Sequence, residues 1–219
     1  LSLKSKPFTI LAGISGTGKS KLVRLFAQAI DADFTLIPVK PDWSDATDLL
    51  GYRDLNQQYQ EGRFIEVIRR ASEEPEKPYI ICLDEMNLAR VEYYFSDFLS
   101  LIESRRKDGD RIITDTFSGE DIKQYIIPDN VYIVGTVNMD ETTFQFSKKV
   151  LDRANTIELS EVNLAYDFDA VKGPEVQVEP LHNDALKSKY LLLKDCKEHR
   201  VLATRVIDQL IAINEILIP

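Results

Sequence analysis

Cysteine is scarce in this sequence, and the two cysteines do not form the basis of a disulfide framework. Cys82 and Cys196 are the only cysteines among 219 residues, and neither has the closely spaced partners that a metal site requires. Cys82 lies inside an apolar run, so we interpret it as a small core residue. The cysteines therefore predict neither disulfides nor metal binding.

Long apolar runs are also absent. No stretch approaches the ~18 residues that a membrane-spanning helix needs, and no apolar signal-peptide region follows the first residues. We therefore expect a cytoplasmic protein without membrane contact. Because the sequence starts at Leu1 and ends in an apolar stretch at 216–219, we also expect it to be a piece of a longer protein.

Positive charge is in the minority. The net charge is −9 and the sequence pI about 4.9, which argues against a large DNA-binding face on this segment because phosphate contacts need clustered Lys and Arg. A few basic residues lining a pore remain compatible with this charge. The length allows one large domain, or one domain and part of another.

The clearest chemical signal is a glycine-rich octapeptide of the form G-x-x-x-x-G-K-[ST] near the N-terminus. Its glycines let backbone N–H groups turn inward around a phosphate. The lysine of this pattern reaches the β- and γ-phosphates, and the following hydroxyl ligates Mg²⁺. The candidate nucleotide-binding residues are Gly13, Ile14, Ser15, Gly16, Thr17, Gly18, Lys19 and Ser20.

The context of this octapeptide favours a nucleotide site over a surface turn rich in small residues. An apolar strand is predicted directly before it, at 8–12. After it, apolar residues at helical spacing predict one face of a helix. Strand, loop and helix in this order are the setting that the motif requires. The predicted helix face consists of Leu22, Leu25, Phe26, Ala29 and Ile30.

A second candidate element is the acidic pair Asp84 and Glu85, which follows the apolar run 79–83. At the carboxyl edge of a parallel sheet, an Asp can hold Mg²⁺. The adjacent Glu can orient and deprotonate the water that attacks a γ-phosphate. The alternative is that the strand simply reaches solvent there. The phosphate loop favours the first interpretation, because Mg²⁺ needs a second protein anchor.

Three further polar residues are candidates. Asn138 follows the predicted strand 131–136, where its amide could bridge the attacking water and the γ-phosphate; an ordinary turn Asn is the alternative. Arg153 suits transition-state charge neutralisation, either in a neighbouring subunit's site or, equally, as a surface salt bridge with Asp152 or Glu158. Arg90 is a second candidate for a subunit contact.

The arrangement of apolar runs predicts an α/β fold with a parallel sheet flanked by helices. We predict strands at 8–12, 34–39, 79–83, 131–136 and 156–159. A β-hairpin insertion is predicted near 105–128, with its polar tip at 118–121. We expect residues 1–161 to form the nucleotide-binding subdomain and 162–219 to begin a helical lid.

With these residues placed, the sequence resembles the AAA+ P-loop NTPases, and more narrowly the McrB-type motor subunits of 5-methylcytosine-specific restriction systems. The Asp-Glu-Met-Asn and Gly-Thr-Val-Asn segments are the more specific parts of the match. The matching stretches are 13–20, 43–52, 83–90 and 128–138.

The resemblance implies a five-stranded parallel sheet, a helical lid, and a homo-oligomeric ring, often a hexamer, with nucleotide sites between subunits. It implies GTP or ATP as substrate with Mg²⁺, a McrC-type partner that carries or recruits a nuclease, and DNA recognition by a separate domain. By match, Lys19 and Ser20 take the phosphate and Mg²⁺ roles, Asp84 and Glu85 the metal and base roles, and Asn138 the sensor role.

The sequence departs from this family at two places. The acidic residue after the sensor strand is either shifted to Asp140 or replaced by Glu141, and the arginine cluster before the last strand is reduced to Arg153. Two other functions stay open from the sequence: a MoxR-like or dynein-related AAA+ ATPase that remodels proteins, and a nucleotide-binding assembly scaffold with little turnover of its own.

Overall fold

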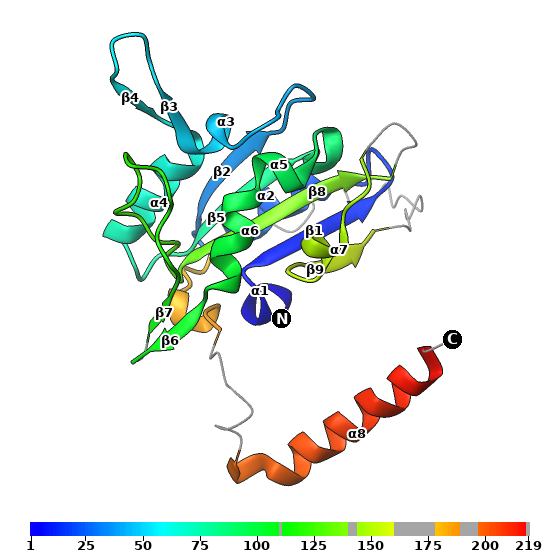
Figure 1. Ribbon diagram of the computed structural model, residues 1–219. Coiled ribbons are helices and arrows are strands. Elements are labelled where there is room, and N and C mark those ends of the chain that lie inside the picture. Colours follow the sequence, from blue (N-terminus) through cyan, green and yellow to red (C-terminus); the bar gives the residue numbers. More distant parts are fainter. Residues whose placement is uncertain (110, 140–143, 160–177, 189–196, 218–219) are drawn as a thin grey trace, which may run out of the picture. The chain divides into compact units, whose positions relative to one another are not determined.

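The computed structural model describes residues 1–109, 111–139, 144–159, 178–188 and 197–217 (Figure 1). The chain forms two compact units, Leu1–Ser188 and Lys189–Pro219. The expected boundary near 161 falls outside the described residues. Residues 178–188 belong to the first unit, where the Asn183 amide accepts a hydrogen bond from the buried Tyr132 hydroxyl at 2.7 Å.

The first unit is built on a five-stranded sheet with the strand order β2-β5-β8-β1-β9. Every neighbouring pair in this sheet is parallel, so the predicted five-stranded parallel α/β fold is confirmed. The strands are β1 Phe8–Gly13, β2 Asp33–Pro38, β5 Tyr79–Asp84, β8 Val131–Asn138 and β9 Asn155–Glu158.

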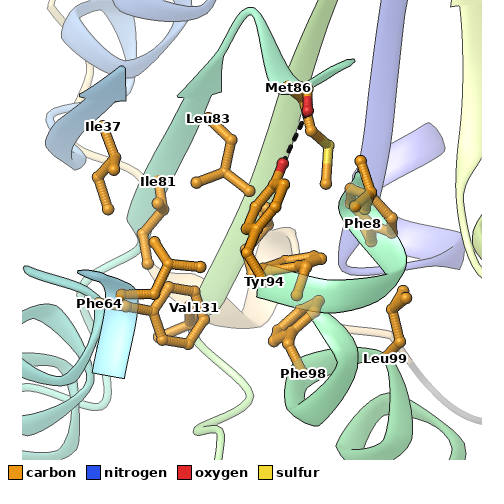
Figure 2. Packing of buried hydrophobic residues seen from close by; sticks show 14 of the residues in the cluster. Phe8, Ile37, Phe64, Ile81, Leu83, Met86, Tyr94, Phe98, Leu99 and Val131 are labelled. Atoms are coloured by element: carbon orange, nitrogen blue, oxygen red, sulfur yellow. Dashed lines mark hydrogen bonds between the residues drawn. The ribbon is translucent and has the colours of Figure 1, made fainter. Parts of the chain in front are cut away.

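The three central strands bury side chains on both faces, as expected for continuous apolar runs in a covered parallel sheet. Side chains alternate between the two faces along each strand, so β5 gives Ile81 and Leu83 to the larger core cluster and Ile80 and Cys82 to the smaller one. Figure 2 shows the larger cluster, in which the Tyr94 hydroxyl donates to the Met86 carbonyl oxygen at 2.8 Å.

Helices cover both faces of the sheet. The larger cluster lies under α4, α5 and α6, and the smaller one lies under α2 (Figure 1). Two-layer coverage of this kind buries the apolar faces of the strands and leaves the strand ends open to solvent. The helices of this unit are α1 Ser2–Ser5, α2 Lys19–Ala29, α3 Thr47–Leu50, α4 Arg63–Glu73, α5 Val91–Tyr94, α6 Ser96–Glu103 and α7 Lys148–Leu151, with 3₁₀ turns at Met86–Leu88 and Asn183–Ala185.

The helix α2 is present as predicted, but the prediction of its core face was wrong. The buried residues are Lys19, Val23 and Ala27, whereas Leu22 is 49% exposed and Phe26 37% exposed. Lys19, Val23 and Ala27 are spaced four residues apart and therefore share one helix face, and the larger apolar side chains lie beside this face. The apolar spacing identified the helix and not its orientation.

Two other local predictions need correction. The helical spacing of apolar residues from 91 to 102 predicts a single helix. The structure interrupts it at Phe95, whose φ of −114° and ψ of 10° end α5 before α6 begins. The hairpin in the insertion pairs β6 Arg106–Asp108 with β7 Arg111–Ile113, so its tip lies beside Gly109 and not at 118–121. Ile127 instead meets this region through its N–H, which donates to the Thr114 hydroxyl at 3.1 Å.

A second hairpin, which the sequence did not predict, joins β3 Gly51–Arg53 to β4 Tyr59–Glu61. Its turn is closed by Asp54, whose carboxylate accepts hydrogen bonds from the Asn56 and Gln58 N–H groups at 2.9 Å. Asp is typical of turns closed in this way. Trp43 is the single tryptophan of the sequence, and we favour a core position for it over a contact with a neighbour. The structure confirms this, because Trp43 is 7% exposed and packs edge-on against Tyr94.

The second unit contains a 3₁₀ turn Lys197–His199 and the helix α8 Arg200–Leu217. Apolar residues at spacings of three and four from Leu202 to Leu217 predict this final helix, and the structure confirms it. That this helix starts a lid stays a prediction. Among the described residues, none of the helices has the length and apolar character that crossing a membrane would require.

Candidate functional site

The loop between β1 and α2 is built around glycines with left-handed backbone angles. Gly16 has a φ of +83° and Gly18, the N-cap of α2, a φ of +81°. Residues with a Cβ atom rarely adopt these left-handed backbone angles. The first N–H groups of α2 lack intrahelical partners, so the loop and the helix N-terminus together suit the binding of an anion such as phosphate.

Lys19 is held inside this loop by its own backbone. It is 6% exposed, and its ammonium donates to the Ile14 carbonyl oxygen at 2.7 Å, the Gly13 carbonyl oxygen at 3.1 Å and the Thr17 hydroxyl at 3.4 Å. Lys19 also borders an open cavity. A phosphate oxygen entering that cavity would compete with these neutral acceptors for the ammonium, and a charged acceptor forms the stronger hydrogen bond.

Asp84 is the last residue of β5, and its carboxylate joins the loop to the sheet. Its Oδ1 atom accepts hydrogen bonds from the Ser20 hydroxyl and, at 2.7 Å, from the Thr136 hydroxyl. Ser20 and Asp84 thus place two oxygen ligands side by side, which fits Mg²⁺ because this ion takes one or two carboxylates together with substrate phosphates and water.

No group of three His, Cys, Asp or Glu side chains that could hold a metal ion is found in the described part of the chain. An ion at Ser20 and Asp84 would therefore need phosphate oxygens and water to complete its coordination. The donor set fits a magnesium ion that arrives with a nucleotide better than a permanently bound metal.

Glu85 and Asn138 meet at the same edge of the sheet. The Asn138 amide nitrogen donates to Oε1 of Glu85 at 2.9 Å, and the register of the sheet pairs Asn138 with Gly13 at the start of the loop. Glu85 is exposed, whereas Asn138 is half-buried. A water molecule beside this carboxylate would have a proton acceptor and an amide within one site.

These groups line one cavity of about 290 Å³ at the carboxyl ends of β1, β5 and β8, which is where open α/β sheets bind ligands. Of the predicted nucleotide-binding residues, Gly13, Ile14 and Thr17 contact Lys19 rather than line the cavity. The lining residues are Ser15, Gly16, Gly18, Lys19, Ser20, Lys21, Asp84, Glu85, Thr136 and Asn138.

A larger cavity of about 400 Å³ lies elsewhere, between α1, α2 and the edge strand β9. Its walls are mostly apolar and include Leu22, Phe26 and Ile157. None of the predicted site residues lines it. We place the chemistry in the smaller cavity because lysine, hydroxyl and carboxylate side chains, among them Lys19, Ser20 and Asp84, converge there.

The structure does not bring Arg153 to the cavity. Its guanidinium forms an ion pair with Glu103 and donates to the Leu99 carbonyl oxygen at 3.1 Å, and its side chain is 11% exposed. The salt bridge expected with Asp152 or Glu158 is thus made with Glu103 on α6. A contact between Arg153 and a neighbour's nucleotide stays a prediction.

Arg90 is exposed and lies between two aromatic rings. Its guanidinium carbon is 5.3 Å from the ring centre of Phe144 and 5.8 Å from that of Tyr93, which is within the range of cation–π attraction. The role of Arg90 in a subunit contact stays a prediction. Asp140 and Glu141 lie outside the described residues.

Two buried residues that the sequence analysis missed support the site. Thr136 bonds to both acidic residues, and Asn87 donates its amide to the Asn138 carbonyl oxygen at 2.9 Å. The available signal was the spacing of Thr136 and Asn138, since residues two apart on a strand share a face. Asn87 follows Glu85 by two residues in a 3₁₀ turn, and no strand period identifies it.

The chain matches the model of the AAA domain, dynein-related subfamily, over residues 9–154. It is 28% identical over 174 residues to the type IV methyl-directed restriction enzyme EcoKMcrB subunit of Escherichia coli K12. This alignment covers 76% of the chain and 37% of the relative, so the chain spans little more than a third of that protein. The predicted resemblance to AAA+ proteins of the McrB type is confirmed.

A solved structure, a proposed ATPase from Cytophaga hutchinsonii, is similar to the chain with a TM-score of 0.49 and 20% sequence identity. The match covers 84% of this chain and 51% of that one.

Proposed function

The chain belongs to the AAA domain family of the dynein-related subfamily, and from this premise we propose that it is a Mg²⁺-dependent nucleoside triphosphatase that hydrolyses GTP or ATP. The observation that supports this best is the convergence of Lys19, Ser20, Asp84, Glu85 and Asn138 on one cavity. These are the groups that in-line attack of water on a γ-phosphate requires.

Each residue has a role set by its position. Lys19 turns from its loop carbonyls to the β- and γ-phosphates, and the N–H groups of the loop and α2 bind the remaining oxygens. Ser20 and Asp84 would hold Mg²⁺, which neutralises charge on the phosphates when bound. Glu85 accepts the proton of the attacking water, and Asn138 orients that water and the Glu85 carboxylate.

The proposal extends to a ring-forming motor of a McrBC-like restriction or defence complex. The similarity to the McrB subunit supports this extension. A hexameric ring, a McrC-type partner with a nuclease, DNA contact through other domains, and Arg153 acting on a neighbour's nucleotide all belong to the same proposal. Activation of turnover with rising protein concentration would support ring assembly. A cytoplasmic location stays a prediction.

A second candidate function is the remodelling of proteins by a MoxR-like or dynein-related ATPase, which the name of the matching subfamily favours. A gene for a McrC-type protein beside this one would support the restriction complex, and a gene for a von Willebrand-type protein would support remodelling. A third possibility, a scaffold that binds nucleotide with little turnover, predicts binding without concentration-dependent activation.

The central test is a competition between GTP and ATP for binding, followed by phosphate release with each nucleotide and Mg²⁺. Lys19→Ala should weaken binding about 10- to 100-fold, the amount expected from a lost hydrogen bond to a charged group. Lys107→Ala is the control, because it removes the same charge from an exposed residue of β6 that does not line the cavity. Equal binding by both variants and the wild type would contradict the phosphate role of the loop.

A further inference from the structure

Thr136 is a buried residue in the floor of the cavity, and its hydroxyl contacts both members of the acidic pair. It is 1% exposed and lies on β8 two residues before Asn138. Its Oγ1 atom donates to the Asp84 carboxylate at 2.7 Å and accepts from the Glu85 backbone N–H at 3.0 Å. One hydroxyl thus fixes a carboxylate on one residue and the backbone of the next.

The backbone that Thr136 holds is strained. Glu85 has a φ of 52° and a ψ of 48°, the left-handed region that costs a residue with a Cβ roughly 1–2 kcal/mol. This angle turns the chain sharply out of β5. Strain of this size persists only where neighbouring contacts hold it, and they do so at both ends of the residue, because the Glu85 carbonyl oxygen accepts from the Leu88 N–H at 2.9 Å.

The turn at Glu85 determines where its carboxylate points. The Asp84 side chain faces Ser20, and the Glu85 side chain one residue later reaches the Asn138 amide. In a regular strand two consecutive side chains would point to opposite faces of the sheet. The left-handed residue brings both carboxylates to one cavity, and the Thr136 hydroxyl is the group that bonds to both sides of this junction.

We propose that Thr136 is a positioning residue for nucleotide hydrolysis: its hydroxyl holds the left-handed turn at Glu85, so that the Glu85 carboxylate lies beside Asn138 while Asp84 faces Ser20. This role rests on the proposed triphosphatase function. It acts through the position of Glu85 and involves no contact of Thr136 with the reacting atoms.

The test compares Thr136→Val, which keeps the branched shape and removes the hydroxyl, with Thr136→Ser, which keeps the hydroxyl. We expect Thr136→Val to lower kcat about 10- to 100-fold, the effect of losing a hydrogen bond to a charged group, with a change in nucleotide affinity below about threefold. Thr136→Ser should stay within about threefold of the wild-type kcat.

The matched control is Thr9→Val on the adjacent strand β1. Thr9 is 3% exposed, and its hydroxyl has no hydrogen-bond partner among the described residues. The same substitution there should leave kcat unchanged. Thermal unfolding of all three variants separates lost turnover from lost folding, and a crystal structure of Thr136→Val should show Glu85 outside the left-handed region.

A double variant decides whether Thr136 acts through Glu85. If it does, Thr136→Val should lower the residual kcat of Glu85→Gln by less than about twofold, because interacting residues are not additive. A full additional loss would overturn the proposed route. A Thr136→Val variant with the wild-type kcat would overturn the role of Thr136. A folded Thr136→Ser variant as slow as Thr136→Val would do the same. Neither result would contradict the triphosphatase function. Wild-type protein that releases no phosphate with either nucleotide would overturn the triphosphatase function itself.

Discussion

Replacing Glu85 with Gln is the sharpest test of the chemistry, because the structure predicts that it changes one property of the site. Glutamine has the same length, and its amide oxygen can still accept the hydrogen bond from Asn138 that Oε1 of Glu85 accepts at 2.9 Å. The backbone bonds at Glu85 do not involve the side chain. Because Glu85 is exposed, we expect the free energy of unfolding to change by less than about 0.5 kcal/mol.

The loss should fall on hydrolysis. A positioned general base contributes about 10²- to 10⁴-fold, which corresponds to about 3–5 kcal/mol in the activation free energy. We therefore expect Glu85→Gln to bind GTP or ATP with nearly wild-type affinity and to release phosphate at least about 100-fold more slowly. Binding is measured by equilibrium titration and turnover by phosphate release, both with Mg²⁺ present.

The matched control is Glu73→Gln, which makes the same change at an exposed residue at the end of α4 and should hydrolyse like the wild type. A Glu85→Gln variant with the wild-type rate would refute the assignment of the base. A variant that loses binding and turnover together would show instead that the carboxylate holds the nucleotide and its metal.

Two further predictions concern the core. Phe98→Ala should lower the free energy of unfolding by about 3–5 kcal/mol, since Phe98 is 4% exposed and stacks on Phe95 at 4.4 Å; a denaturant titration showing a loss below about 1 kcal/mol would contradict this packing. Burial, with the Asp84 charge adding to it, raises the pKa of the Cys82 thiol from 9.0 to about 12. The stability of the wild type relative to Cys82→Ala should therefore be fully present below about pH 9 and be lost as the pH rises toward 12. Parallel curves of unfolding free energy for the two proteins between about pH 8 and about pH 11 would contradict this prediction.

The sequence predicted the parts of the site that depend on local chain order. Positions 16 and 18 of the loop require glycine, because the backbone angles there are left-handed. An acidic residue directly after a buried strand reaches the carboxyl edge of the sheet by chain connectivity alone. The positions of Lys19, Ser20, Asp84 and Asn138 around one cavity follow from these two rules and the parallel sheet.

The parts that the sequence could not predict depend on tertiary contacts. The spacing of Leu22 and Phe26 was correct for a helix, yet Val23 and Ala27, one position further along the chain, are the residues that the packing buries. Glu103, the ion-pair partner of Arg153, is distant in sequence, and only the packing of α6 places it beside Arg153. The periodicity of apolar residues shows which side chains share a helix or strand face, and tertiary packing determines what that face contacts.

The register of β8 against its neighbours connects the features set by local chain order with those set by tertiary contacts. Leu83 pairs with Gly135 and Gly13 pairs with Asn138, so the residues that follow bring Asp84 level with Thr136. A slip of one residue would turn Thr136 and Asn138 to the other face of the sheet. The same slip would move Tyr132 and Val134 out of the cluster under α2. The burial of apolar side chains therefore selects the same register that gathers the polar ones at the carboxyl edge, and the core and the site cannot vary independently of each other.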